Sequence, residues 1–176
     1  MAAIAVPSGR RGDGLPSSLT FIGKAGADGY LASIAAAVAG RPATGPVRAP
    51  GRIEIAVVGA HLSGLPLNHE LVGLGGVFVR AAATTSDYSL YALPNTTPPK
   101  PGLLRTGAGA AIAVEVWALD AAGFGEFVSR IPAPLGIGTL SLDDGTAVKG
   151  FLVEAEAVKG AEDISTYGGW RAYLKR

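Results

Sequence analysis

The chain has 176 residues, of which 48% are hydrophobic and only 7% aromatic, a size that suits one domain with an additional segment. Its 15 basic and 14 acidic side chains leave a net charge of +1 without a basic stripe, so we expect no nucleic acid partner. Cysteine is absent, which excludes disulfides, thiolate metal sites and cysteine nucleophiles.

Neither a membrane span nor a signal peptide is predicted. The longest weakly polar stretch, residues 32–39, has less than half of the ~20 residues that cross a bilayer. The charges of residues 8–14 follow the short apolar run 2–6, whereas a signal peptide places its charges first. We therefore expect a soluble, cytoplasmic protein without membrane contact.

Residues 1–40 differ in character from the rest of the chain. An apolar run at 2–6 and an alternating, strand-like stretch at 18–22 enclose a turn-rich loop. Asp28 then begins a predicted helix that ends near Gly40. The apolar stripe of this helix is narrow and consists mostly of small side chains, so the segment needs something larger to pack on.

A linker is predicted at residues 41–51, where repeated prolines and glycines disfavour both helix and sheet. The sequence is thereby divided into an N-terminal strand–helix segment (1–40), the linker, and a domain over 52–176.

The domain over 52–176 consists of short predicted strands separated by turns. Strands are expected at 53–57, 77–79, 88–93, 103–106, 110–119, 138–142 and 147–154. The last four pair as two predicted hairpins, with turns at 107–109 and 143–145. Asp120 caps a predicted helix, and residues 169–174 form a closing helical turn. This pattern indicates the α+β class: a small mixed β-barrel or bent sheet with one or two flanking helices.

His61 is the principal candidate for chemistry, because it follows the first strand of the domain in a glycine-flanked turn. Such a turn presents the imidazole while neighbouring backbone N–H groups face a ligand. The alternative is a histidine that only hydrogen-bonds its own turn. His69 and Glu70 could add metal ligands, but the set is too small for a convincing site, so we expect no metal.

Other candidates have two interpretations each. Lys100 and Arg105 flank a proline-rich loop and either meet an anionic substrate or are solvated. Glu115, within an apolar strand, is either a structural acid or an acid that lines a cavity. The proline- and glycine-rich residues 131–138 form either the rigid wall of a cavity or a structural crossover.

Seven runs keep the order and spacing of a known family: 58–68, 88–93, 100–105, 115–117, 131–138, 149–151 with Glu154, and 163–174. On these runs, residues 53–174 resemble the C-terminal domain of allophanate hydrolase, which has the γ-glutamyl cyclotransferase-like fold. Residues 2–9, 14–16 and the helix after Asp28 resemble the last segment of an amidase-signature domain, which lies immediately upstream in that enzyme.

The resemblance implies a role in urea degradation. The amidase half of the enzyme would release ammonia from allophanate and leave N-carboxycarbamate, whose decarboxylation this domain would speed. Because the Ser–Ser–Lys set of such amidases is missing from the sequence, the chain is not expected to hydrolyse allophanate by itself. The expected partners are a small dicarboxylate and an amidase-signature domain, and no cofactor is implied.

Position and chemistry make His61 the expected general acid, since decarboxylation with C–N cleavage needs a proton on the departing nitrogen. The expected substrate-binding residues surround it in sequence or flank the proline-rich loops: Gly59, Ala60, Leu62, Asn68, Tyr88, Arg105, Pro134 and Gly136.

Two other functions compete with this one. The domain could be a non-catalytic packing or homo-oligomerisation module of the amidase, since the N-terminal segment leaves an apolar face exposed. It could also be a cyclotransferase-like enzyme acting on a γ-glutamyl amine. The cyclotransferases have a Tyr-Gly turn where this sequence has residues 58–61, and a glutamate where it has 129–132, so this function would require another acid, such as Glu126, in the cavity.

Overall fold

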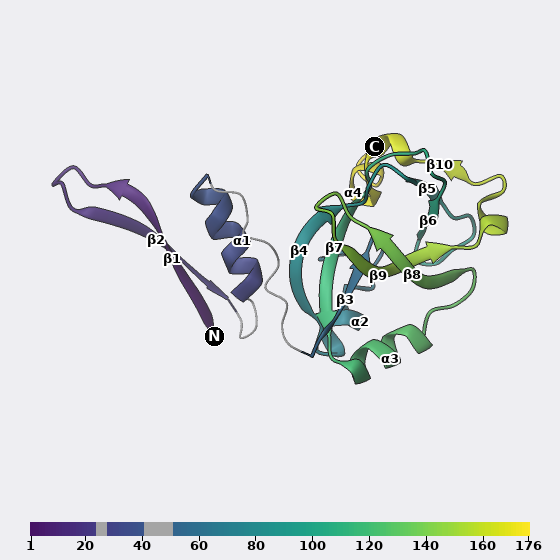
Figure 1. The fold of residues 1–176 in the computed structure, drawn as a ribbon, viewed down its shortest axis with the longest axis horizontal. Helices are drawn as coiled ribbons and strands as arrows, with labels where there is room; N and C mark the ends of the chain where they lie inside the picture. The colour runs from purple at the N-terminus through teal and green to yellow at the C-terminus, as the bar shows by residue number, and fades with distance from the viewer. Residues whose placement is uncertain (24–27, 41–50) are drawn as a thin grey trace.

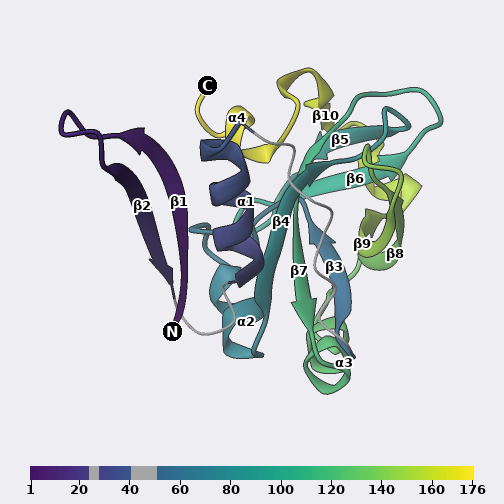
Figure 2. The same ribbon diagram turned by 60° about the vertical axis from the view of Figure 1, so that its left-hand side comes forward.

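A computed structural model describes residues 1–23, 28–40 and 51–176. At the N-terminus, β1 (Ala2–Arg10) and β2 (Pro16–Gly23) form an antiparallel hairpin, followed by α1 (Asp28–Val38). Figure 2 shows α1 between this hairpin and the body of the protein. The predicted strand–helix order of the segment is therefore present, although β1 extends further into the expected loop. Residues 41–50 of the predicted linker lie outside the described residues.

The body combines a five-stranded mixed sheet of order β4-β7-β3-β9-β8 with a three-stranded sheet of order β10-β5-β6 (Figure 1). Strands β3 and β9 are parallel, and the other pairs are antiparallel. In chain order the elements are β3 (Ile53–Val57), α2 (Asn68–Gly73), β4 (Val77–Ala83), β5 (Tyr88–Ala92), β6 (Pro101–Arg105), β7 (Ala113–Leu119), α3 (Ala121–Ser129), β8 (Leu135–Ser141), β9 (Ala147–Val153), η1 (Ala155–Val158), β10 (Glu162–Asp163), η2 (Ser165–Tyr167) and α4 (Trp170–Tyr173).

The α+β class with a bent mixed sheet and few helices is confirmed, but the barrel is not closed. The five-stranded sheet has β4 and β8 at its two edges, and these strands do not form a ladder with each other. A single bridge between Thr84 and Leu142 joins the two sides. Closure of a barrel needs a continuous ladder between the edge strands, which this single bridge does not provide.

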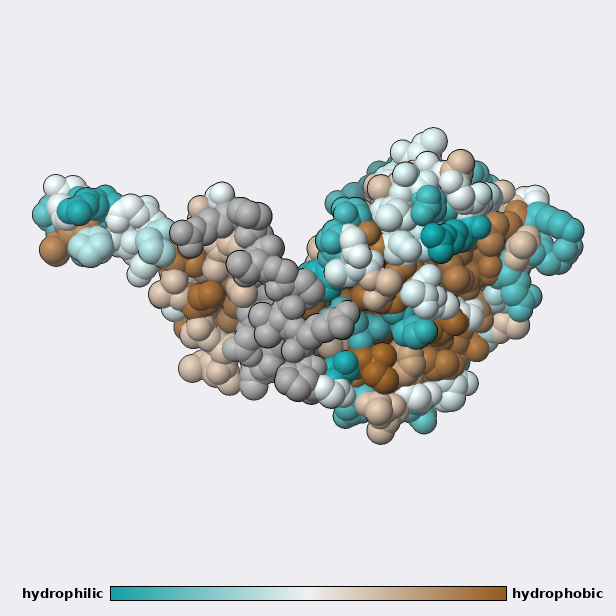
Figure 3. All heavy atoms as spheres, viewed as in Figure 1, coloured by the Kyte–Doolittle hydropathy of each residue, from teal (hydrophilic) through white to brown (hydrophobic). Residues whose placement is uncertain are grey.

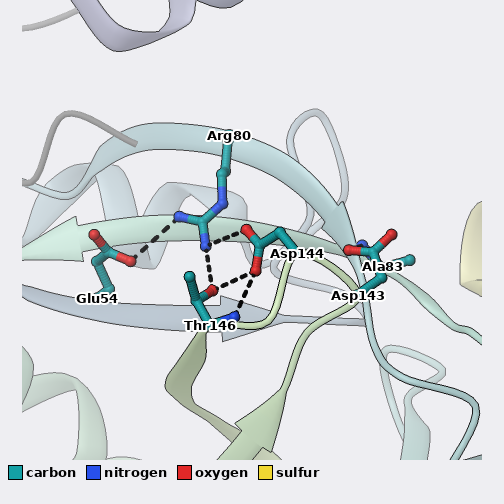
Figure 4. Close-up of polar contacts among 6 residues, drawn as sticks. All are labelled: Glu54, Arg80, Ala83, Asp143, Asp144 and Thr146. Atoms are coloured by element: carbon teal, nitrogen blue, oxygen red, sulfur yellow. Dashed lines mark hydrogen bonds and ion pairs between the residues drawn. The ribbon is translucent and has the colours of Figure 1, made fainter. Parts of the chain in front are cut away.

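Side chains complete the contact between the two edges of the sheet (Figure 4). Arg80 on β4 donates to Glu54 Oε2 on β3 at 3.3 Å and to Thr146 Oγ1 at 2.9 Å, and its Nη2 lies 3.1 Å from Asp144 Oδ2. Thr146 and Asp144 belong to the turn between β8 and β9. Because Arg80 and Glu54 are largely buried, this cluster ties the hairpin to β4 in addition to the backbone hydrogen bonds beside the Thr84–Leu142 bridge.

The hairpin predicted around residues 107–109 is wrong. Strand β6 pairs with β5 in the smaller sheet, whereas β7 lies between β3 and β4 in the larger one. The glycine-rich turn instead carries the chain from one sheet to the other. A Cβ atom at Gly109 would lie 2.1 Å from the Tyr88 carbonyl oxygen, so the close passage requires glycine there. Alternation along a strand identifies its two faces but not its partner.

The other local predictions for the body are confirmed. Strands β8 and β9 pair as the predicted second hairpin. Asp120 caps α3, since its Oδ1 accepts the Gly123 N–H at 2.7 Å. Trp170 and Tyr173 of the closing helix α4 are buried in the hydrophobic core.

Apolar side chains gather on the surface over α3, β8 and β9 (Figure 3). Phe124, Ile137 and Leu152 are partly buried apolar residues of these elements that pack on the core. The N-terminal segment also exposes large apolar side chains, among them Leu19 and Ile22 on β2. None of the helices in the described ranges combines the length and the apolar character that crossing a membrane requires.

Candidate functional site

A cavity of about 160 Å³ lies just beyond the carboxyl end of β3. Helices α2 and α3, which line it, lie at the same end of the large sheet in both ribbon views (Figures 1 and 2). The loop that leaves β3 forms one side of the cavity, and the loop before β6 and the start of β8 close others. Its polar lining side chains are His61, Glu70, Lys100 and Arg130, and its apolar ones include Leu67, Phe127, Ile131, Leu135 and Phe151.

His61 sits at the boundary between the polar and the apolar lining. Its Nε2 lies 2.9 Å from Glu70 Oε2 on α2, and its side chain is only 15% exposed. The ring stacks on Phe151, with centroids 5.3 Å apart and planes inclined by 15°, and meets Phe127 edge-on at 5.0 Å. Because an ionised carboxylate only accepts hydrogen bonds, Glu70 places the proton of the neutral imidazole on Nε2.

The surroundings of His61 lower its pKa below the ordinary value of 6.5. Burial among apolar groups is the main cause, because it penalises the charged imidazolium. The hydrogen bond and the negative charge of Glu70 act in the opposite direction, and the nearby positive charge of Lys100 adds to the lowering. The free protein therefore holds His61 mainly neutral at neutral pH, in a position where an anion in the cavity would favour its protonation.

The loop after β3 supplies backbone donors to the same cavity. Gly59 and Ala60 are buried, and no acceptor within the described residues takes the N–H groups of Ala60 or His61. A Cβ atom at Gly59 would lie 2.4 Å from Pro101 Cδ, so this close packing requires glycine. Buried N–H groups without a partner make a site for an anion, since leaving them unpaired is costly.

Two cationic side chains line the cavity. Lys100 comes from the loop before β6, and Arg130 from the end of α3. Arg130 is half exposed and pairs with Glu126 at 2.7 Å across one helical turn. Together with the backbone donors, these cations make the polar side of the cavity suited to a small anion.

Several of the predicted site residues are brought together in or beside the cavity. Gly59, Ala60 and His61 line it. Asn68 does not line it but holds the loop, because its Nδ2 donates to the His61 carbonyl oxygen at 2.9 Å. Leu62 turns away from the cavity and is buried in the hydrophobic core.

The remaining predicted site residues do not line the cavity. Tyr88 is fully buried, and its hydroxyl accepts the Ser141 N–H at 3.0 Å. Arg105 lies over the Tyr88 ring and 3.5 Å from Asp87 Oδ2. Pro134 and Gly136 are absent from the lining, although their neighbours Pro132 and Leu135 contribute to it. Residues 131–138 thus form part of a cavity wall, but only through Ile131, Pro132 and Leu135.

Sequence reasoning missed several contributors to the cavity, among them Glu70, Phe127, Phe151 and the cation Arg130. Glu70 was considered only as a metal ligand, although its position in the helix that follows the His61 loop could have signalled a carboxylate partner. Phe127 and Phe151 lie far from His61 in the sequence, and no local pattern connects them with it. Within the described ranges, no three His, Asp or Glu side chains are grouped in a way that could hold a metal ion.

Glu115 is a structural acid that does not line the cavity but holds Ser63 of the loop after β3. Its Oε2 accepts the N–H and the hydroxyl of Ser63, each at 2.8 Å, and the indole N–H of Trp117 at 3.2 Å. Its Oε1 accepts from Arg171 Nη2 at 2.7 Å. Both oxygens of this buried carboxylate have hydrogen-bond partners. Of the two interpretations of Glu115, the structure therefore supports the structural one.

Known proteins match this chain along nearly its whole length. The urea amidolyase of Lachancea kluyveri is 40% identical over 202 residues, which cover 99% of this chain and 11% of that protein. A solved structure of Kluyveromyces lactis allophanate hydrolase has a TM-score of 0.69 and 36% identity over 98% of this chain and 33% of its own. The chain spans only 11% of the length of the curated relatives it matches.

A shorter protein matches part of this chain. The crystal structure of c4763, a uropathogenic E. coli-specific protein, has a TM-score of 0.66 and 34% identity over 71% of this chain and 97% of its own. The family model of the allophanate hydrolase C-terminal domain matches residues 53–175, which make up most of this chain. The chain therefore belongs to the allophanate hydrolase C-terminal domain family.

Proposed function

We propose that this chain promotes the decarboxylation of N-carboxycarbamate during urea degradation, at the cavity that holds His61. The observation that carries the proposal is the composition of this cavity. The loop after β3 contributes backbone N–H groups, Lys100 and Arg130 contribute positive charge, and the rest of the lining combines the His61–Glu70 pair with apolar side chains. A dianion that must lose one carboxylate as neutral CO₂ needs both anion-binding groups and apolar groups in its site.

The polar side would hold the carboxylate that is retained. The N–H groups of Ala60 and His61 are available as donors, and Lys100 adds a positive charge. Fixed donors of this kind bind an anion without reorganisation, as an oxyanion hole does. They would also fix which end of the substrate faces the apolar wall.

The apolar side would favour departure of the other carboxylate. Phe127, Phe151 and Leu135 offer no hydrogen bonds to it, so its charge is poorly solvated in the bound state. Decarboxylation removes that charge as CO₂ leaves. An interaction that is worse for the ground state than for the transition state lowers the barrier.

The reaction consumes one proton. The C–N bond to the departing carboxylate breaks, its electron pair remains on nitrogen, and a proton is transferred to that nitrogen, so that the dianion and one proton yield CO₂ and carbamate. His61 would supply this proton. Binding of the dianion would raise the pKa of His61 from its lowered value, and Glu70 would keep the imidazolium in place.

The dianion has to come from an amidase that acts on allophanate, and we propose an amidase-signature domain as the partner. The curated relatives align with 99% of this chain, whereas the family model begins at residue 53. The N-terminal hairpin and α1 therefore have counterparts in the longer relatives that are not part of this family's domain. We interpret residues 1–40 as the last segment of the amidase domain.

A packing or assembly role is the second candidate. The exposed Leu19, Ile22 and Val38 of the N-terminal segment favour association with another protein surface. A cyclotransferase-like activity has less support, because Glu126 does not line the cavity and pairs with Arg130 instead. The carboxylate that lines the cavity is that of Glu70.

Replacement of His61 tests the proposed proton donor. We expect His61→Asn to reduce the catalysed loss of N-carboxycarbamate at least ~100-fold, the lower end of the usual contribution of general acid catalysis. The dianion would be generated from allophanate by the isolated amidase half of a related enzyme and followed by ¹³C NMR. The matched control is His69→Asn, since His69 is exposed and outside the cavity. An active His61→Asn variant would contradict the assignment.

Malonate, a stable dicarboxylate with a methylene group in place of the nitrogen, tests the anion site. We expect Lys100→Met to weaken malonate binding about tenfold, equivalent to ~1.4 kcal/mol, because a cation next to the carboxylate is lost. Arg105→Met should leave the affinity unchanged, since Arg105 pairs with Asp87 away from the cavity. Calorimetric titration of both variants makes the comparison. Equal losses, or a loss in Arg105→Met alone, would refute the proposed site.

Titration of the His61 ring by NMR tests its environment. We expect a pKa below 6.5, a lower one in Glu70→Gln because a group that raises it is lost, and no change in Glu126→Gln. In the unfolded chain the pKa returns to about 6.5, so the unfolded state binds more protons below that pH. The contribution of His61 to the free energy of unfolding is therefore complete above pH 6.5 and falls as the pH falls through the folded pKa. A pKa at or above 6.5 would contradict the account.

A further inference from the structure

We propose that Glu115 and Arg171 are positioning residues for the His61 loop, residues 58–67, so that the C-terminal helix α4 holds the site in its working geometry. The catalytic consequence rests on the proposed function. The mechanical part, that this pair fixes the position of the loop, concerns the folded chain alone.

The His61 loop has few hydrogen bonds to the rest of the molecule. Within the described residues, the hydrogen bonds of 59–67 end within 59–70, with those of Ser63 as the exception. The Leu62 and Leu67 N–H groups donate to the Gly59 and Ala60 carbonyls, for example. The loop and α2 are thus bonded to each other, and among the described residues Ser63 makes the loop's hydrogen bonds to the rest of the molecule. The other links of the loop are packing contacts, such as Leu62 in the core and the His61 ring on Phe151.

Ser63 is held on all of its polar groups. Its N–H and hydroxyl both donate to Glu115 Oε2 at 2.8 Å, and its carbonyl oxygen accepts from Arg171 Nη2 at 2.6 Å. The same Nη2 lies 2.7 Å from Glu115 Oε1. Glu115 is on β7, an inner strand of the large sheet, and Arg171 is on α4, so the clamp connects the sheet, the C-terminus and the loop.

The clamp joins a largely buried carboxylate to a partly exposed guanidinium. The Glu115 side chain is 12% exposed, and Trp117 holds the same Oε2 with its indole N–H at 3.2 Å. Hydrogen bonds that involve a charged partner in a partly buried setting are stronger and more directional than those between neutral groups. Ser63 lies two residues from His61, so a change in the clamp moves the imidazole and the N–H groups of 60 and 61 together.

A small displacement of these groups is expected to matter. Donors and proton-transfer groups work within about 0.5 Å of their required positions, and a shift of about 1 Å costs on the order of 100-fold in rate. Arg171 is therefore expected to influence the reaction without touching the substrate. This distinguishes it from Lys100, which lines the cavity itself.

Arg171→Met in the full chain tests the proposal, with Arg176→Met as its matched control. Both arginines lie at the C-terminus, are about half exposed and pair with a glutamate, but Arg176 pairs with Glu162 away from the loop. For Arg171→Met we expect a fall in kcat of at least tenfold, a shift of the His61 ring NMR signals and weaker malonate binding. For Arg176→Met we expect none of these, with a similar change in Tm.

A conservative series keeps the test valid if Arg171→Met is unstable. Arg171→Lys retains the charge but cannot span both Ser63 and Glu115 as the guanidinium does, so its kcat should be intermediate. Ser63→Ala removes one bond to Glu115 and should shift the His61 signals with little loss of Tm. If these variants lower Tm alone, with unchanged His61 signals and malonate affinity, Glu115 and Arg171 are merely structural and the proposal is overturned.

The two proposals fail in different ways. If the unaltered chain does not accelerate decarboxylation, the proposed function fails, while the His61 signals still report whether the clamp positions the loop. If the unaltered chain is active and Arg171→Met retains its kcat and His61 signals, the positioning role fails and the proposed function stands.

Discussion

The candidate site depends on one constraint: His61 is enclosed by aromatic side chains with a single carboxylate, Glu70, as its hydrogen-bond partner. Burial against Phe127 and Phe151 disfavours the imidazolium, and Glu70 partly compensates. The protonation state of His61 is thus balanced between two opposing effects. A charged ligand in the cavity is then able to change that state.

The fold provides this constraint through the end of one strand. Strand β3 is central in the large sheet, and the chain leaves it directly into the His61 loop. Gly59 allows Pro101 to pack against that loop. Helix α2 contributes Glu70 to the cavity, and α3 contributes Phe127. The open edges of the sheet do not affect this arrangement, because the cavity lies at the end of its central strand.

The sequence was sufficient for the features that have local causes. Alternation and turn residues predicted β3, the β8–β9 hairpin and the cap at Asp120, and the glycine-flanked turn singled out His61. Features that depend on distant partners could not be predicted from local patterns. The pairing of β6 with β5 was missed, since periodicity carries no information on partners. Lys100 and Arg105, at opposite ends of β6, were indistinguishable in the sequence, and the structure places only Lys100 in the cavity lining.

The central claim is that the unaltered chain accelerates the loss of CO₂ from N-carboxycarbamate. The most direct measurement is the first-order decay constant of ¹³C-labelled N-carboxycarbamate at increasing concentrations of this chain, at fixed pH and with the amidase that generates it held constant. The account predicts a decay constant that rises in proportion to the concentration of the chain and is suppressed by malonate. A decay constant that stays at its value in buffer would contradict the claim and leave a packing or assembly role for this domain.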